Sequence, residues 1–209
     1  MTRRSSSSEH VAKPVRWLLD SSAGLLRIER LAISVLSTLL LVLVLINVVT
    51  RYTGFPIYWI DEAAVYSVVW LTFIGASLMT RLRMDFAVTM LTEHLGERGA
   101  YWCKVVATGS IAFFGIALLA MCWLWMDPLG ILMFGFDAKE FGAQTFNFLY
   151  TERTQTLEWP VWVLQTVIPL FAFTLTVHSL ANLVEDAGLA PPRPRPPGFE
   201  TLKNADTVN

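Results

Sequence analysis

The chain has 209 residues, of which 54% are apolar and 16% charged, with a formal net charge of −1 and a mean hydropathy of +0.50. Soluble domains carry about 25% charged residues, so this composition favours an integral membrane protein. The near-zero net charge gives no reason to expect a nucleic-acid partner. Cys103 and Cys122 are expected on one helix, about 28 Å apart, which excludes a disulfide between them.

The N-terminal residues 1–30 are predicted to form a cytoplasmic tail and an interfacial helix. Residues 1–13 are polar and Ser-rich, whereas residues 13–30 alternate basic side chains with apolar ones. The second pattern predicts a short helix on the membrane surface, with a loose linker as the alternative. Residues 31–49 are free of charge and largely apolar, so they predict a first transmembrane span that is retained rather than cleaved.

Two further spans are predicted at residues 62–80 and 105–126. The eighteen residues 63–80 carry no charge, which corresponds to about 27 Å of helix, close to the hydrocarbon thickness of a bilayer. Between these spans, residues 84–95 place apolar side chains at helical spacing and predict a short interfacial helix. The span at 105–126 is also uncharged and has tryptophans at both ends.

Residues 127–158 form the longest connection and hold five acidic and five Phe residues. This segment is too long for a structureless loop, so we expect a folded cap with one short helix. The fourth span is predicted at residues 159–183, where Pro160 fits a first helical turn and Pro169 should either kink the helix or be accommodated by neighbouring helices. Residues 185–209 are predicted to be a Pro-rich cytoplasmic tail.

The predicted fold class is all-α integral membrane, with a four-helix membrane domain over residues 31–184 and short interfacial helices. Thirteen of the sixteen Lys and Arg residues fall on one side of the predicted spans, and three fall on the other. By the positive-inside rule, both termini should lie in the cytoplasm. The cap at residues 127–158 would then face outward.

Few residues suggest catalysis or cofactor binding. The histidines are His10, His94 and His178, and only His178 falls within a predicted span. A haem site between membrane helices would need paired histidines at matching depths, so we expect His178 to be a hydrogen-bonded packing residue or to reach the interface. Phosphate-binding glycine motifs and metal-ligand spacings are lacking in the sequence. We therefore predict no enzyme activity, no cofactor and no metal.

Apart from Glu62 at the start of the second, the four predicted spans contain no charged residue, whereas translocation paths usually show charges or broken helices near the middle of the membrane. This favours an accessory subunit over an independent permease. Small and polar residues share faces of the second and third spans, and they predict close helix packing. They are Ala64, Ser67, Gly75, Ala76, Thr108, Ala112 and Gly115. These faces either pack the four helices together or dock a larger integral partner.

Charged residues bracket the second span. Arg51, Asp61 and Glu62 precede its apolar part, and they predict an ion pair that fixes the outer end of the first helical hairpin. Binding of an ion or of an external partner is the alternative. Arg81 and Arg83 follow the span and are predicted to anchor its inner boundary.

The order of motifs along the second span and its flanks resembles that of a known protein family. The pattern W-x-D-E occupies residues 59–62, W-x-x-F-x-G-A occupies residues 70–76, and Arg81 and a V-x-x-L ending at 88–91 follow. This combination resembles the small membrane subunit (Q-type, DctQ-like) of tripartite ATP-independent periplasmic (TRAP) transporters. Where that family often shows a histidine and an acid after the second span, Asp85 and Thr89 stand here, which suggests a particular subfamily.

The resemblance implies a non-catalytic scaffold in the bacterial inner membrane. Its partners would be membrane lipids, a large membrane subunit that moves solute and sodium by an elevator-type motion, and a periplasmic binding protein that captures an organic acid. Trp70 and Gly75 would lie in the interhelical or partner face. The competing hypotheses are a membrane anchor or cytochrome-type four-helix subunit of a redox complex, and a self-contained small channel or exporter.

Overall fold

The computed structural model describes residues 12–84 and 96–191. Over these residues the chain is helical apart from turns, loops and one isolated β-bridge between Arg153 and Pro160. Four helices are long and apolar enough to cross a membrane, which confirms the predicted all-α membrane class. Residues 1–11 of the predicted N-terminal tail, residues 85–95 of the interfacial helix predicted at 84–95, and residues 192–209 of the predicted Pro-rich tail lie outside the described residues.

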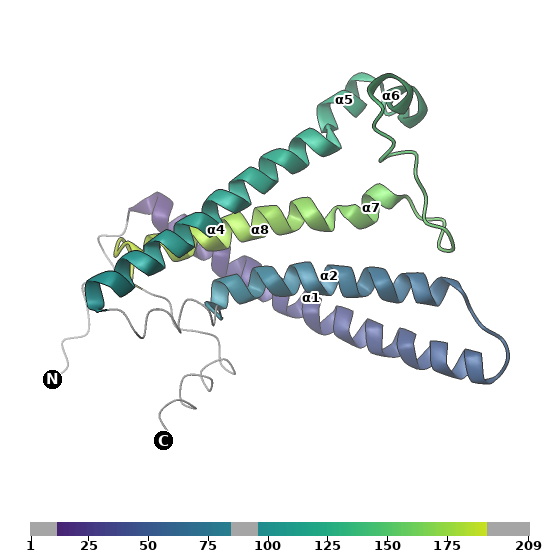
Figure 1. The fold of residues 1–209 in the computed structure, drawn as a ribbon, viewed down its shortest axis with the longest axis horizontal. Coiled ribbons are helices and arrows are strands. Elements are labelled where there is room, and N and C mark those ends of the chain that lie inside the picture. Colours follow the sequence, from purple (N-terminus) through teal and green to yellow (C-terminus); the bar gives the residue numbers. More distant parts are fainter. Residues whose placement is uncertain (1–11, 85–95, 192–209) are drawn as a thin grey trace.

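Helices α1 (Lys13–Tyr52) and α2 (Trp59–Leu82) form an antiparallel hairpin (Figure 1). Gly54 in the connecting turn has a φ of 80°, a conformation that glycine adopts without steric cost. α1 is one helix of 40 residues, so the surface helix and the first span, predicted as separate elements, are continuous. The first part of α1 gains packing partners because Leu19 lies against the end of α8 and Leu26 lies against α2.

The cap follows α4 (Glu97–Met126) and contains two short helices, α5 (Pro128–Met133) and α6 (Ala138–Thr145), rather than the single one expected. Each begins at an aspartate whose side chain accepts backbone N–H groups of the first turn, Asp127 for α5 and Asp137 for α6. Such caps satisfy amide donors that have no partner within a short helix. The two aspartates therefore explain why the chain turns twice here.

An aromatic core holds the cap against the end of α4. The Phe141 side chain is fully buried and makes edge-on ring contacts with Phe134 and Tyr150. The Tyr150 hydroxyl donates to the Met126 carbonyl at 2.6 Å. Burial, and then the charge of Asp127, raises the pKa of Tyr150, so the hydroxyl keeps its proton and remains a donor.

The fourth span is broken into α7 (Val161–Gln165) and α8 (Val167–Asp186). The interruption falls at Thr166, three residues before Pro169. Proline has no N–H to donate and its ring clashes with the carbonyl four residues earlier, here that of Gln165. The predicted kink is therefore confirmed, and it falls one turn ahead of the proline.

α8 is the central helix of the bundle. It packs against α1, α2 and α4, and Figure 1 shows it between α2 and α4. In the most apolar stretch of the fourth span, 44% of the residues are buried, against 6% in α1. The helices converge where α8 ends and spread apart toward the cap (Figure 1). Most large apolar side chains of α1 therefore face outward, as expected for a helix in contact with lipid or a partner.

Candidate functional site

A hairpin cluster of Asn47, Arg51 and Asp61 joins the ends of α1 and α2. Arg51 Nη2 lies 2.6 Å from Asp61 Oδ2. Asn47 bonds both partners, since its Nδ2 donates to Asp61 Oδ1 and its Oδ1 accepts from Arg51 Nε at 3.0 Å. The Arg51 and Asp61 side chains are 59% and 45% exposed, so the pair contributes at most about 1 kcal/mol.

Glu62 holds a different element, the loop that precedes α7. Its carboxylate accepts the backbone N–H groups of Gln155, Thr156 and Leu157 at 3.1, 2.8 and 2.9 Å. It also accepts the Thr156 hydroxyl. We expected Glu62 to belong to the ion pair with Arg51, and this is a correction: three converging amides satisfy the carboxylate instead. Glu62 thus ties the cap loop to the start of α2.

An α8-end cluster of Arg81, Arg83, Asn182, Glu185 and Asp186 lies at the opposite end of the bundle. Arg81 Nη2 is 2.7 Å from Glu185 Oε1, and these side chains are only 8% and 4% exposed. Arg83 pairs with Asp186 and, at 3.4 Å, with Glu185. Two cations and two anions therefore neutralise one another in largely buried space, and each keeps a partner as buried charges require.

The α8-end cluster connects three helices. Asp186 accepts the hydroxyl of Thr108 from α4 at 2.9 Å, and Asn182 Nδ2 donates to a backbone carbonyl of α2 at 2.7 Å. The two arginines at the end of α2 turn toward α8, because α8 continues to Glu185 and Asp186, which were predicted to lie in the tail. Their role as anchors of the inner membrane boundary stays a prediction.

Ser22, His178 and Glu29 form a buried chain between α1 and α8. Ser22 Oγ lies 2.8 Å from His178 Nδ1, and His178 Nε2 lies 3.0 Å from Glu29 Oε2. His178 is confirmed as a hydrogen-bonded packing residue, and with both ring nitrogens engaged it has none free for a haem iron. Hydrolases also combine a serine, a histidine and an acid, but this hydroxyl is fully buried and no substrate can reach it.

Part of the predicted packing face lies inside the bundle. Ser67 and Ala112 are buried, and Gly115 lies where α4 closely approaches α8. A Cβ atom on Gly115 would lie 2.7 Å from Thr176 Oγ1 and 3.3 Å from its backbone. Only glycine allows the two helices to come this near.

The other predicted packing residues are not enclosed by this chain. A Cβ atom on Gly75 would meet nothing within 4 Å, Ala76 is exposed, and Ala64 is half-buried. Ala64 and Gly75 share one face of α2, and Ala76 lies on an adjacent face. These small residues are therefore available to another molecule rather than used for packing within the subunit.

Trp70 forms a hydrogen bond with the backbone at the helix break in the fourth span. Its Nε1–H donates to the Leu164 carbonyl at 3.0 Å. A break leaves carbonyls without intrahelical donors, so the indole from α2 replaces one missing bond. The sequence motif pointed to Trp70 as a packing residue, and the structure adds this hydrogen bond.

A family model matches most of the chain. The matching family model is described as tripartite ATP-independent periplasmic transporters, DctQ component, and it covers residues 40–188. The chain belongs to the DctQ family. The predicted resemblance to the Q-type subunit is thereby confirmed, and membership excludes the redox-complex alternative. Comparisons with curated proteins and with solved structures found no match.

As a DctQ component, the chain is the small membrane subunit of a TRAP transporter and not an enzyme. It is a multi-pass protein of the inner membrane, in agreement with the four helices of the described residues that are long and apolar enough to span a membrane. In the tripartite system it works with a large membrane subunit and a periplasmic binding protein. Its functional surfaces are therefore those that hold the bundle together and those that meet the partners.

The buried polar contacts near the start of α1 of this DctQ subunit were not predicted from the sequence. Ser22 and Glu29 are seven residues apart, on the same buried face as Leu19 and Leu26. That spacing marks one side of a helix and could have shown that Glu29 lies inside the bundle. Both polar residues precede residue 40, so they also lie outside the part that the family model matches.

Proposed function

We propose that this DctQ subunit is the non-catalytic scaffold of a sodium-coupled importer of organic acids. The binding protein would deliver the solute, and the large subunit would carry it with sodium by an elevator-type motion. The small subunit would be the stationary body beside which the moving domain slides. The observation that supports this role best is the set of polar bonds that fixes α8 to α1, α2 and α4.

The chemistry of the interior supports a scaffold rather than a pathway. Arg81 and Glu185 neutralise each other, and His178 is bonded on both sides. A transport path needs polar groups that can exchange partners with a passing ion or solute. Groups that are already paired within a closely packed bundle are poorly suited to such exchange.

The proposal includes an orientation. Three of the sixteen Lys and Arg residues lie at the hairpin and cap end of the spans, namely Arg51 at the end of α1 and Lys139 and Arg153 in the cap, and the rest fall on the other side. The positive-inside rule therefore favours a periplasmic cap and cytoplasmic termini. The hairpin cluster and Glu62 would mark the periplasmic end, and Arg81 and Arg83 the cytoplasmic end.

We also propose which surfaces meet the surroundings. Exposed leucines on the second half of α1 would contact membrane lipids. The small residues Ala64, Gly75 and Ala76, on two adjacent faces of α2, would lie against the large subunit, because small side chains let helix backbones approach closely in lipid.

Reconstitution tests the scaffold role. Vesicles would receive the small subunit alone, the large subunit with the binding protein, or all three proteins, and uptake of a labelled organic acid would be followed with and without a sodium gradient. We expect no uptake by the small subunit alone, sodium-dependent uptake by the full set, and a large loss when the small subunit is omitted. Uptake by the lone subunit, or full uptake without it, would refute the proposal.

A pair of matched variants tests the α2 face. Gly75→Leu should lower the yield of the complex and its transport rate, because the new side chain would separate the subunits. Gly109→Leu on α4 is the control, since a Cβ atom there also meets nothing within 4 Å. Equal effects of the two substitutions, or none from either, would show that α2 does not provide this contact.

A further inference from the structure

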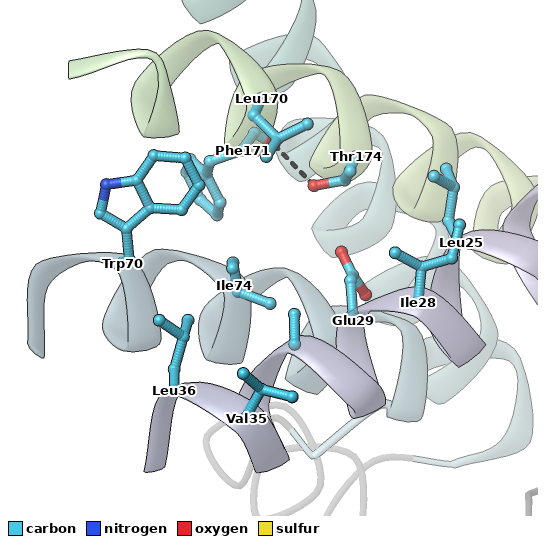
Figure 2. A pocket seen from close by; sticks show the side chains of 11 residues that line it. Leu25, Ile28, Glu29, Val35, Leu36, Trp70, Ile74, Leu170, Phe171 and Thr174 are labelled. Carbon is cyan, nitrogen blue, oxygen red and sulfur yellow. Dashed lines mark hydrogen bonds between the residues drawn. The ribbon is translucent and has the colours of Figure 1, made fainter. Parts of the chain in front are cut away.

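A cavity of about 340 Å³ lies between α1, α2 and α8 (Figure 2). This is roughly the volume of ten molecules of liquid water, so the cavity is far larger than a packing defect. Most of its wall is apolar, formed by residues that include Leu25, Leu36, Ile74, Leu170 and Phe171. A cavity of this kind suits an occupant with a long apolar portion.

Glu29 supplies the charge in the cavity wall. The residue is 5% exposed, and Figure 2 shows its carboxylate turned from α1 into the space below α8. Oε2 is 3.0 Å from His178 Nε2. Oε1 is buried and has no hydrogen-bond partner within the described part of the chain.

Glu29 differs from the other buried acids of the bundle. Glu185 and Asp186 pair with arginines, as buried ions generally do. Among the described residues, Glu29 pairs only with His178, which is charged only when protonated, and does so through one of its two carboxylate oxygens. An acyl chain that entered the cavity would fill its apolar part but would offer no hydrogen-bond donor to Glu29. A better occupant has an apolar stem and a positively charged donor at its tip.

We propose that the cavity is a socket for a lysine or arginine side chain of the large membrane subunit. The methylene groups would pack against Leu36 and Ile74, and the charged tip would donate to Glu29 Oε1. The inference rests on the proposed scaffold function, because it names a contact that would hold the stationary subunit to its partner. Charge complementarity decides the occupant, since the described wall of the cavity carries a carboxylate and no cation.

The mouth of the socket suits a partner helix. Ile28 and Val35 line the cavity and are 65% and 57% exposed. Together with Val42 and Val49 they form an exposed row of β-branched residues that repeats every seven positions along α1. A seven-residue repeat of this type lets a second helix pack lengthwise against the first. A helix on this row would pass directly over the socket.

Photo-crosslinking in the assembled complex tests the occupant. A benzoyl-phenylalanine would replace Ile28 in the small subunit, co-expressed and purified with its large subunit. The same group at Phe113, an exposed position on α4, is the control. We expect Ile28 to crosslink to a large-subunit segment that contains a lysine or arginine within one helical turn. A product with lipid only, with a second copy of this chain, or with a segment that lacks such a cation would overturn the proposal.

Two substitutions test the charge and the space separately. Glu29→Gln keeps an oxygen for His178 but removes the charge and points an amide N–H₂ group into the cavity. Ala32→Phe fills the cavity, whose wall includes Ala32, and leaves Glu29 in place. Each should raise the dissociation constant for the large subunit by about tenfold or more. Ala120→Phe, on an exposed part of α4 outside the cavity, is the control and should change it little.

The readouts separate folding, the socket and the scaffold role. Elution and thermal unfolding of each isolated variant show whether it folds, and Ala32→Phe remains informative if Glu29→Gln does not. Unchanged affinity in a folded variant of either kind would overturn the socket. Reversing the charge of both partners, with Glu29→Lys and a glutamate at the crosslinked cation, should restore binding, and absence of rescue would also count against it. The scaffold role is judged independently, by uptake with and without the small subunit.

Discussion

The pair of Arg81 and Glu185 gives a direct measure of how strongly the α8-end cluster holds the bundle. The side chains are 8% and 4% exposed and their charged atoms are 2.7 Å apart. Removing one partner of a buried ion pair costs about 3–5 kcal/mol, because the other charge is left uncompensated. After Arg81→Met, Glu185 keeps only its 3.4 Å contact with Arg83. We expect a loss near the lower limit, about 3 kcal/mol in the free energy of unfolding.

Titration of the purified subunit with sodium dodecyl sulfate in mixed micelles, followed by circular dichroism, measures this loss. Arg51→Met is the matched control, because Arg51 and Asp61 are 2.6 Å apart but 59% and 45% exposed. The two pairs have nearly the same separation, and burial is what distinguishes them. Exposed pairs contribute about 1 kcal/mol or less, so the control should lose little.

A double variant checks the mechanism of the loss. Arg81→Met combined with Glu185→Leu removes both charges, and apolar replacement of a whole buried pair is often close to neutral. Arg83 keeps Asp186 as its partner in this variant. We therefore expect the double variant to be more stable than Arg81→Met alone. A double variant whose loss equals the sum of the single losses, or an Arg51→Met loss as large as that of Arg81→Met, would refute the reasoning.

Three other substitutions probe the remaining contacts of the bundle. Gly115→Ala should destabilise the isolated subunit by about 1–3 kcal/mol because its methyl group would meet α8, whereas Gly75→Ala should leave it unchanged in the same titration. Trp70→Phe should cost about 1–3 kcal/mol because the Leu164 carbonyl loses its donor, and unchanged stability would remove that role. Glu62→Gln should accelerate hydrogen exchange at the three loop amides that its carboxylate accepts, and unchanged protection would mean that other contacts hold the loop.

The spans were accessible to sequence reasoning because membrane insertion imposes a local requirement. Each needs about twenty predominantly apolar residues, and backbone groups in lipid must be bonded within the helix. The break before Pro169 was also predictable, since proline acts on its own turn. The continuity of α1 was not predictable, because its first part depends on contacts of Leu19 and Leu26 with distant helices.

The polar interior could not be derived from local periodicity. Glu29 and His178 are 149 positions apart, and Arg81 and Glu185 are 104 apart. A helical pattern shows which residues share a face, but it does not show which face of another helix they meet. The same gap explains the error over Glu62, whose acceptor role depends on where the cap loop returns. The sequence showed which charged residues lie at each end of α2, but it did not show which residues they bind.

The spacing of polar residues along α8 ties the local bonds to the scaffold role. Thr174, His178, Asn182 and Asp186 follow one another at intervals of four, which places them along one side of the helix. They bond α2, α1, α2 and α4 in turn. A shift of α8 by one residue relative to its neighbouring helices would rotate this row by about 100° and break all four sets of bonds at once. Trp70 from α2 fixes the other end of the span at the helix break. No such shift of α8 keeps some of these bonds while exchanging others, so the bundle should behave as one rigid body. This favours a transport cycle whose moving parts lie in the large subunit.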